Sequence, residues 1–156
     1  MVRRDVSARA TEPGLRIELL WIDDEIDMIE VRVEASNGRF AATAELYANF
    51  DVFARLATAL RGFPASSDDR REFSAGNFDD AYGGGGFRFT LQCADPGGSG
   101  RLELHVRADR DGSPHDRTET ATFCLAVDAS LIDRCVRQLD GIREPVVGAR
   151  AALGGD

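Results

Sequence analysis

The sequence predicts an α+β fold in which two βββα units form one mainly antiparallel sheet of six to seven strands, with two helices packed on one face. Apolar and polar residues alternate in six segments, a period typical of strands with one buried face. After each group of three segments the apolar spacing changes to three or four residues, which indicates an amphipathic helix. A length of 156 residues fits a single domain that needs no metal or disulfide to fold.

The first unit spans residues 15–63. Its first strand places Leu15, Ile17, Leu19 and Trp21 on one apolar face. An acidic turn at 23–25 leads to a second strand over 29–35, and Asn37-Gly38 indicates a hairpin turn because both residues tolerate a positive φ. The third strand carries Phe40, Ala42, Ala44 and Leu46. The helical face that follows consists of Val52, Phe53, Leu56, Ala57, Leu60 and Phe63, with Asn49 or Asp51 as the cap.

The second unit spans residues 87–142 and repeats this order. Alternating apolar residues predict strands over 87–93, 102–108 and 121–127. Adding 79 to each position of the first helical face gives a second apolar face, so the two halves could be an internal repeat. That second face consists of Leu131, Ile132, Cys135, Val136, Leu139 and Ile142, with Asp128 or Ser130 as the cap.

Three segments lie outside the two units. Residues 1–14 lack apolar periodicity, and we expect a flexible arm there. Residues 64–86 form a polar linker, within which Arg71-Glu72-Phe73-Ser74 could add a short edge strand. We expect residues 143–156 to form a flexible tail.

The charge balance excludes one class of partner. The chain has 19 basic side chains, all arginine, against 27 acidic ones, a net charge of −8. Nucleic-acid binding needs a clustered basic surface, so we expect no nucleic-acid partner. The abundance of Arg, Ala and Gly fits a GC-rich bacterial genome. The absence of lysine excludes Schiff-base and lysine-base chemistry.

Localisation follows from what the sequence lacks. It has no apolar run near the ~20 residues of a membrane span, and no apolar stretch follows the N-terminal arginines as in a secretory signal. The three cysteines, Cys93, Cys124 and Cys135, are odd in number and widely spaced, which argues against a disulfide framework. We therefore expect a cytoplasmic protein that does not contact membranes.

Candidate binding residues come from the polar sheet face and from one loop. If neighbouring strands pair, His105 lies near Arg32 and Glu34 on the polar face, where it could act as a base. The loop before the second unit is aromatic and acidic, which suits protein contact. The predicted binding residues are Phe78, Asp79, Asp80, Tyr82, Arg32, Glu34, His105 and Arg107.

Catalytic and cofactor motifs are weak. The carboxylates of Asp23, Asp24, Glu25 and Asp27 could hold a hard cation, but they lack the spacing of a calcium loop, and an exposed turn is favoured. The glycines at 83–86 lack the lysine of a phosphate loop and precede a strand instead of a helix. We predict no catalytic residue, no metal and no cofactor.

One resemblance is structural. The stretch from Glu45-Leu46-Tyr47 to Leu60-Arg61-Gly62-Phe63-Pro64, followed by a charged linker and a glycine-rich turn, is similar to a pattern in small bacterial proteins of unknown function. The resemblance covers most of residues 15–142 and implies no reaction.

These observations favour a non-enzymatic, cytoplasmic protein-binding module that neutralises a basic protein, in the manner of a toxin-neutralising protein. A first alternative is a small-molecule binder with a pocket between sheet and helices, where Ala41, Ala42, Ala44, Ala57 and Ala59 leave room. A second alternative is a metal-assisted hydrolase that uses the 23–27 carboxylates. A homodimer through a sheet edge or the bare face is also compatible with the pattern.

Overall fold

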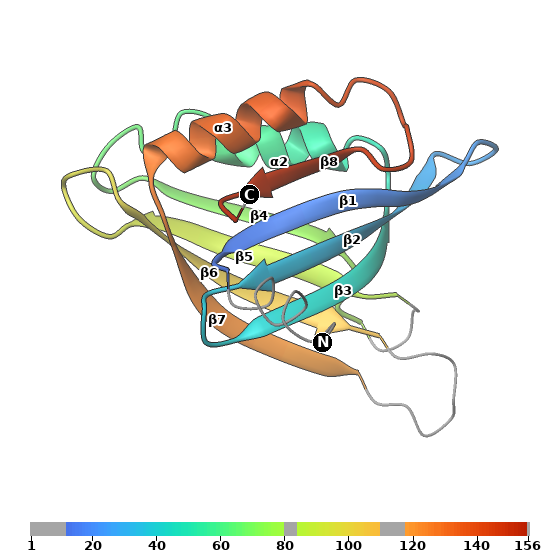
Figure 1. Ribbon diagram of the computed structural model, residues 1–156, viewed down its shortest axis with the longest axis horizontal. Helices are drawn as coiled ribbons and strands as arrows, with labels where there is room; N and C mark the ends of the chain where they lie inside the picture. Colours follow the sequence, from blue (N-terminus) through green and yellow to red (C-terminus); the bar gives the residue numbers. More distant parts are fainter. Residues whose placement is uncertain (1–11, 80–83, 110–117, 156) are drawn as a thin grey trace, which may run out of the picture.

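The α+β prediction is confirmed, but the single sheet is wrong. The computed structural model describes residues 12–79, 84–109 and 118–155, and these form two antiparallel four-stranded sheets and two helices (Figure 1). The first sheet has the order β3-β2-β1-β8, with β1 (Gly14–Asp23), β2 (Met28–Ser36), β3 (Ala41–Ala48) and β8 (Arg150–Leu153). The second has the order β4-β5-β6-β7, with β4 (Arg70–Gly76), β5 (Gly86–Cys93), β6 (Gly100–Ala108) and β7 (Glu119–Val127).

The core explains why two sheets form. The apolar faces of both sheets and one face of each helix, α2 (Val52–Leu60) and α3 (Ala129–Asp140), share one cluster of buried side chains. A helix of nine residues is only about 14 Å long, so these helices are too small to cover six strands. The two sheets bury each other instead, and the helices close the open side between β8 and β4 (Figure 1).

Each half of the chain gives its last strand to the sheet of the other half. The strand after α2 is β4, which pairs with β5, and the strand after α3 is β8, which pairs with β1. The edge strand expected at 71–74 is therefore confirmed within β4. The flexible tail expected at 143–156 is wrong at 150–153, because Ala151 and Leu153 of β8 are buried against β1 and α3. A four-residue strand was too short to show alternation in the sequence.

Two aromatic residues predicted to face the core are exposed. The register of β1 against β2 shifts between Leu19 and Trp21, and this irregularity turns the Trp21 side chain outward, where it is 45% exposed. Phe40 precedes β3 in the turn and is 64% exposed. The other apolar positions of β2, β5 and both helices lie in the core or pack against it, as predicted.

Each sheet edge carries a hydrogen bond that occupies part of it. The Gly85 amide donates to the Glu45 carbonyl on β3, and the Asn37 side chain donates to the Cys124 carbonyl on β7. Arg55 of α2 donates to the Ser74 carbonyl on β4. On β8, the Ala152 amide donates to the Gln138 side chain of α3. Backbone groups that a second sheet would need are thus partly occupied at all four edges.

Candidate functional site

The outer face of the second sheet has a hollow of about 690 Å³ lined by polar side chains. Antiparallel pairing aligns these side chains in rows across the four strands. One row contains Ser74, Arg88, His105 and Thr122, and the next contains Glu72, Thr90, Glu103 and Cys124. We call this hollow the outer hollow; it is lined by Glu72, Ser74, Arg88, Thr90, Glu103, His105 and Thr122.

Phe78 folds over one end of this hollow. Its ring lies 4.7 Å from the Arg88 guanidinium carbon and 5.6 Å from the centre of the His105 ring. The absence of a side chain at Gly86 makes this possible, because a Cβ there would lie 3.0 Å from the Phe78 ring. The structure thus brings together Phe78 and His105, two of the predicted binding residues.

The His105 ring is oriented by one hydrogen bond, and its pKa is lowered. Its Nδ1 lies 2.8 Å from the Thr122 hydroxyl. Burial of the ring and the nearby Arg88 lower the pKa of His105, so the ring is neutral at pH 7. The hollow therefore presents an imidazole beside the Arg88 guanidinium in one row, with the Glu72 and Glu103 carboxylates in the next row, an arrangement suited to hydrogen bonding with a polar partner.

Arg32 and Glu34 lie on the opposite outer face, so their expected proximity to His105 is wrong. They belong to β2 of the first sheet, whereas His105 belongs to β6 of the second. The core separates the two faces. Charges alternate across the first sheet in the row Glu45, Arg32, Glu18 and Arg150, in which Arg32 and Glu45 are 3.0 Å apart. A wider hollow of about 890 Å³ lies over this face.

The remaining predicted residues divide into three groups. Asp79 is exposed beside the outer hollow, and its amide donates to the Asn77 side chain. Arg107 is only 4% exposed, so it does not lie open on the polar sheet face, and its binding role stays a prediction; it pairs in register with Gly86 at the crowded end of β6. Asp80 and Tyr82 lie outside the described residues.

Two of the carboxylates at 23–27 accept hydrogen bonds from backbone amides in and beside the β1–β2 turn. Asp23 accepts a hydrogen bond from the Glu25 amide, and Asp27 accepts one from the Phe50 amide. Across residues 12–79, 84–109 and 118–155, no group of three His, Cys, Asp or Glu side chains could hold a metal ion. The metal-assisted hydrolase therefore gains no support from the geometry.

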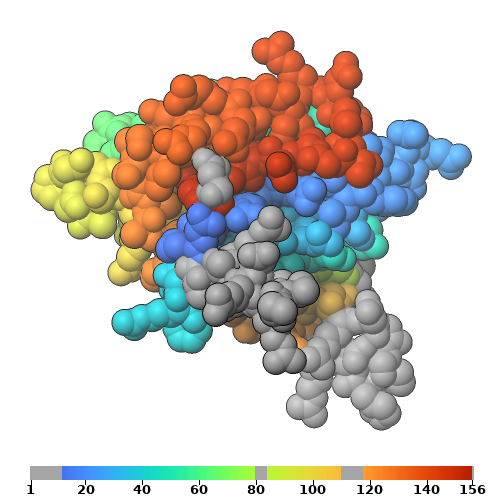
Figure 2. All heavy atoms as spheres, viewed as in Figure 1, coloured from blue at the N-terminus to red at the C-terminus, as the bar shows by residue number. Residues whose placement is uncertain are grey.

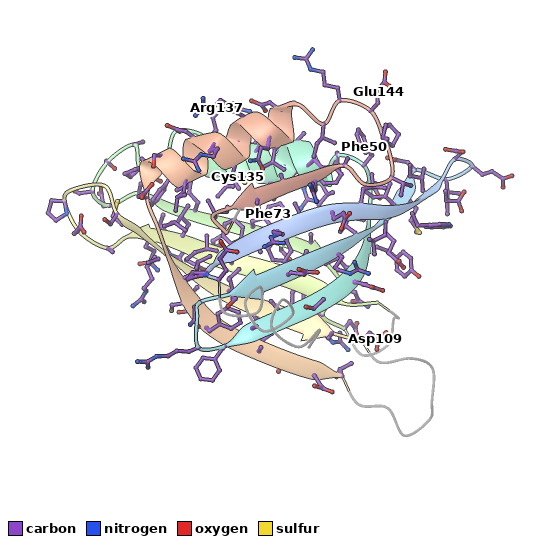
Figure 3. The ribbon with its side chains drawn as sticks, in the orientation of Figure 1. Phe50, Phe73, Asp109, Cys135, Arg137 and Glu144 are labelled. Carbon is purple, nitrogen blue, oxygen red and sulfur yellow. The ribbon has the colours of Figure 1, made fainter. Side chains whose placement is uncertain are left out.

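The cysteines differ in environment. Cys135 is buried under α3, and this burial raises the pKa of its thiol to about 12 (Figure 3). Cys93 is half-buried and donates to the Ser66 carbonyl, whereas Cys124 is exposed on the outer face of β7. Of the three thiols, that of Cys124 is the exposed one.

A second surface was missed by sequence reasoning. Trp21, Ile26 and Tyr47 are 45%, 53% and 47% exposed; Trp21 and Tyr47 lie where the β1–β2 hairpin meets the end of β3, and Ile26 lies in the turn of this hairpin. Figure 2 shows this hairpin projecting from the body of the molecule. The sequence contains one signal for it, since residues 17–31 hold no arginine or histidine. We call this region the hairpin surface; it consists of Trp21, Asp23, Asp24, Glu25, Ile26, Asp27, Glu30 and Tyr47.

Comparisons with protein-family models, with curated proteins and with solved structures found no match. In the part of the chain that the structure describes, no helix is both long and apolar enough to cross a membrane.

Proposed function

We propose that this chain is a non-enzymatic protein-binding module that neutralises a basic protein. The distribution of ion pairs carries this proposal. Arg32 pairs with Glu45 and Arg70 pairs with Glu72 on the sheets, whereas the four carboxylates of residues 23–27 form no ion pair with any described arginine. Three of these carboxylates, those of Asp24, Glu25 and Asp27, are exposed in the turn at one end of the first sheet.

Such a distribution favours association with a cationic surface. A net charge of −8 attracts a basic partner over roughly 8–10 Å at physiological salt, and this attraction speeds the encounter. Carboxylates without an ion pair also engage a partner at a lower cost in free energy, because no internal salt bridge must be broken. The outer hollow, with Phe78 at its end, offers a further polar surface for contact.

A salt-dependent capture experiment tests the proposal. The immobilised chain is incubated with extract from its source cells at low and at moderate salt, and retained proteins are identified. We expect a protein of high isoelectric point that is retained at low salt and reduced at moderate salt. The retained protein is then purified and titrated against the chain, and a Kd that rises with salt is expected.

Two loop variants test whether residues 78–79 contact the partner. Phe78→Ala and Asp79→Asn variants report whether the 78–79 loop contributes, since weaker capture by them assigns contact to that loop. Recovery of no partner by the wild type and by both variants, or of acidic proteins alone, would contradict the proposed function.

A small-molecule binder is the second candidate. A hollow of about 490 Å³ lies between α2 and β4 and is lined by Ala59, Arg55 and Phe73 among others. The first alternative called for a pocket between sheet and helices; of its five alanines only Ala59 lines this hollow, and Ala44 and Ala57 are buried in the core. A metabolite library screened by thermal shift tests this candidate, and a binder whose effect is lost in Ala59→Leu would support it.

A further inference from the structure

We propose that the hairpin surface is the docking site, and that it binds an arginine- or lysine-rich segment of the partner with a cationic side chain lying against Trp21 and Tyr47. This inference rests on the proposed function and gives it a location. Aromatic rings attract guanidinium and ammonium groups through their negative faces, and nearby carboxylates add to that attraction.

The backbone presents the aromatic side chains outward. Strict alternation in β1 would bury Trp21 beside Leu19, but the register shift between these residues reverses its direction. At 45% exposure, Trp21 leaves much of its apolar surface in water, which is less favourable than burial. Bulges that re-aim a side chain are common next to functional sites, so this cost is consistent with a role in binding.

Trp21 and Tyr47 form an organised pair. Glu30 lies between them in the register of β1, β2 and β3, and the two rings meet edge to face with centres 6.5 Å apart. The interaction of the Tyr47 hydroxyl with the Glu30 carboxylate raises the pKa of Tyr47. The two rings therefore contact each other without a partner, which reduces the entropy lost on binding.

The surrounding charge selects the occupant. Asp24, Glu25 and Asp27 are exposed in the turn that joins β1 to β2, at the same end of the sheet as the aromatic pair. A second copy of this chain would bring the same carboxylates together and would be repelled. An uncharged apolar partner would leave them without compensation. A basic segment satisfies both the rings and the carboxylates, and aromatic residues within a polar rim match the usual anatomy of a protein interface.

The single tryptophan of the chain makes a direct test possible. The full chain is titrated with a soluble peptide of alternating Arg and Gly, followed by Trp21 fluorescence and by calorimetry. A peptide of alternating Glu and Gly is the charge control. We expect saturable binding of the Arg-Gly peptide with a change in fluorescence, and no response to the Glu-Gly peptide.

Matched variants locate the site. Tyr47→Leu keeps an apolar side chain but removes the ring, and we expect Kd to rise about fivefold. Phe40→Leu is the control, because Phe40 is an exposed aromatic residue in the β2–β3 turn, at the opposite end of the sheet. A double variant Asp24→Asn/Glu25→Gln is expected to raise Kd at least as much, whereas Asp68→Asn/Asp133→Asn, with the same charge change elsewhere, is expected to raise it less. Thermal unfolding confirms that each variant is folded.

The outcomes separate the two proposals. Equal effects of the hairpin variants and their controls would show that basic ligands bind elsewhere, which overturns the location but leaves the proposed function standing. Absence of Arg-Gly binding in both readouts would overturn this inference, while the capture experiment still decides whether a basic protein is bound.

Discussion

At the scale of single residues, Arg71 joins α2 to β4. Its guanidinium makes two hydrogen bonds of 2.8 Å to the Asp69 carboxylate and two more to the carbonyls of Ala59 and Arg61. The two side chains are only 21% and 11% exposed. The Arg71 hydrogen bond holds the pKa of Asp69 below its ordinary value. A half-buried ion pair with further hydrogen bonds contributes more than an exposed one.

We therefore expect Asp69→Asn to lower the free energy of unfolding by about 2 kcal/mol at pH 7. Because the folded pKa is lowered, the contribution is complete above the unfolded value of about 3.9 and is lost as pH falls through the folded pKa. Urea unfolding of both proteins between pH 2 and 7 measures this, and the difference between them should shrink at the acidic end. Asp140→Asn is the control.

The Asp140 control breaks the exposed pair Arg61–Asp140, whose side chains are 55% and 46% exposed. Such pairs typically contribute less than about 1 kcal/mol. Equal losses in the two variants would show that the hydrogen bonds of Arg71 add nothing to the pair.

At the scale of elements, the two helices begin differently. The Asp128 side chain accepts a hydrogen bond from the Leu131 amide and thereby caps α3. Asp51 occupies the same position at α2 but makes no side-chain cap bond. The Leu131 bond also helps to keep the pKa of Asp128 low.

Replacement of Asp128 by alanine should therefore destabilise the protein by about 1 kcal/mol. Asp51→Ala serves as the matched control and should change stability by only a few tenths. Chemical denaturation of both variants at pH 7 provides the comparison. A larger loss at Asp51 than at Asp128 would contradict the assignment of the cap.

The edge strands of both sheets are partly protected against pairing with another chain. The bonds made by Gly85, Asn37, Arg55 and Gln138 each occupy one backbone group that a homodimer through edge pairing could otherwise use. These bonds reduce the number of free backbone groups, which is a common protection against pairing with other chains. The outer faces and the hairpin surface are left as the broader surfaces for contact.

At the scale of the whole molecule, the exchange of final strands ties the halves together. In the first sheet, Ala151 of β8 pairs with Ile17 of β1. In the second sheet, Phe73 of β4 pairs with Phe89 of β5, so the strand after each helix pairs with the first long strand of the other half. Each sheet therefore needs a strand from the other half, and neither half has a complete sheet of its own. This arrangement predicts that the two halves unfold together.

Removal of residues 149–156 tests this dependence. We expect a loss of at least about 3 kcal/mol in unfolding free energy, because the buried Leu153 and Ala151 and their hydrogen bonds to β1 are lost. Arg150→Ala is the control, since its side chain is exposed. A truncated chain with an unchanged denaturation midpoint would show that β8 is not part of the cooperative unit.

The candidate site was only partly predictable. The sequence identified Phe78 and His105, which do meet, because loop composition and strand alternation are local signals. It also joined Arg32 and Glu34 to His105, which is wrong, since alternation shows which side of a strand is polar but not which sheet holds the strand. The Trp21–Tyr47 pair was missed because an irregularity in strand register leaves no mark in an alternating pattern.

The sequence by itself determined six of the seven longer strands and a candidate for the seventh, β4. It also determined both helical faces and the excess of acidic residues, because apolar spacing and charge can be read directly from the residues. Only the tertiary structure decided that the strands divide into two facing sheets, that β8 completes the first, and that Trp21 points outward. These features depend on how much apolar surface distant segments can cover, and no local pattern encodes that quantity.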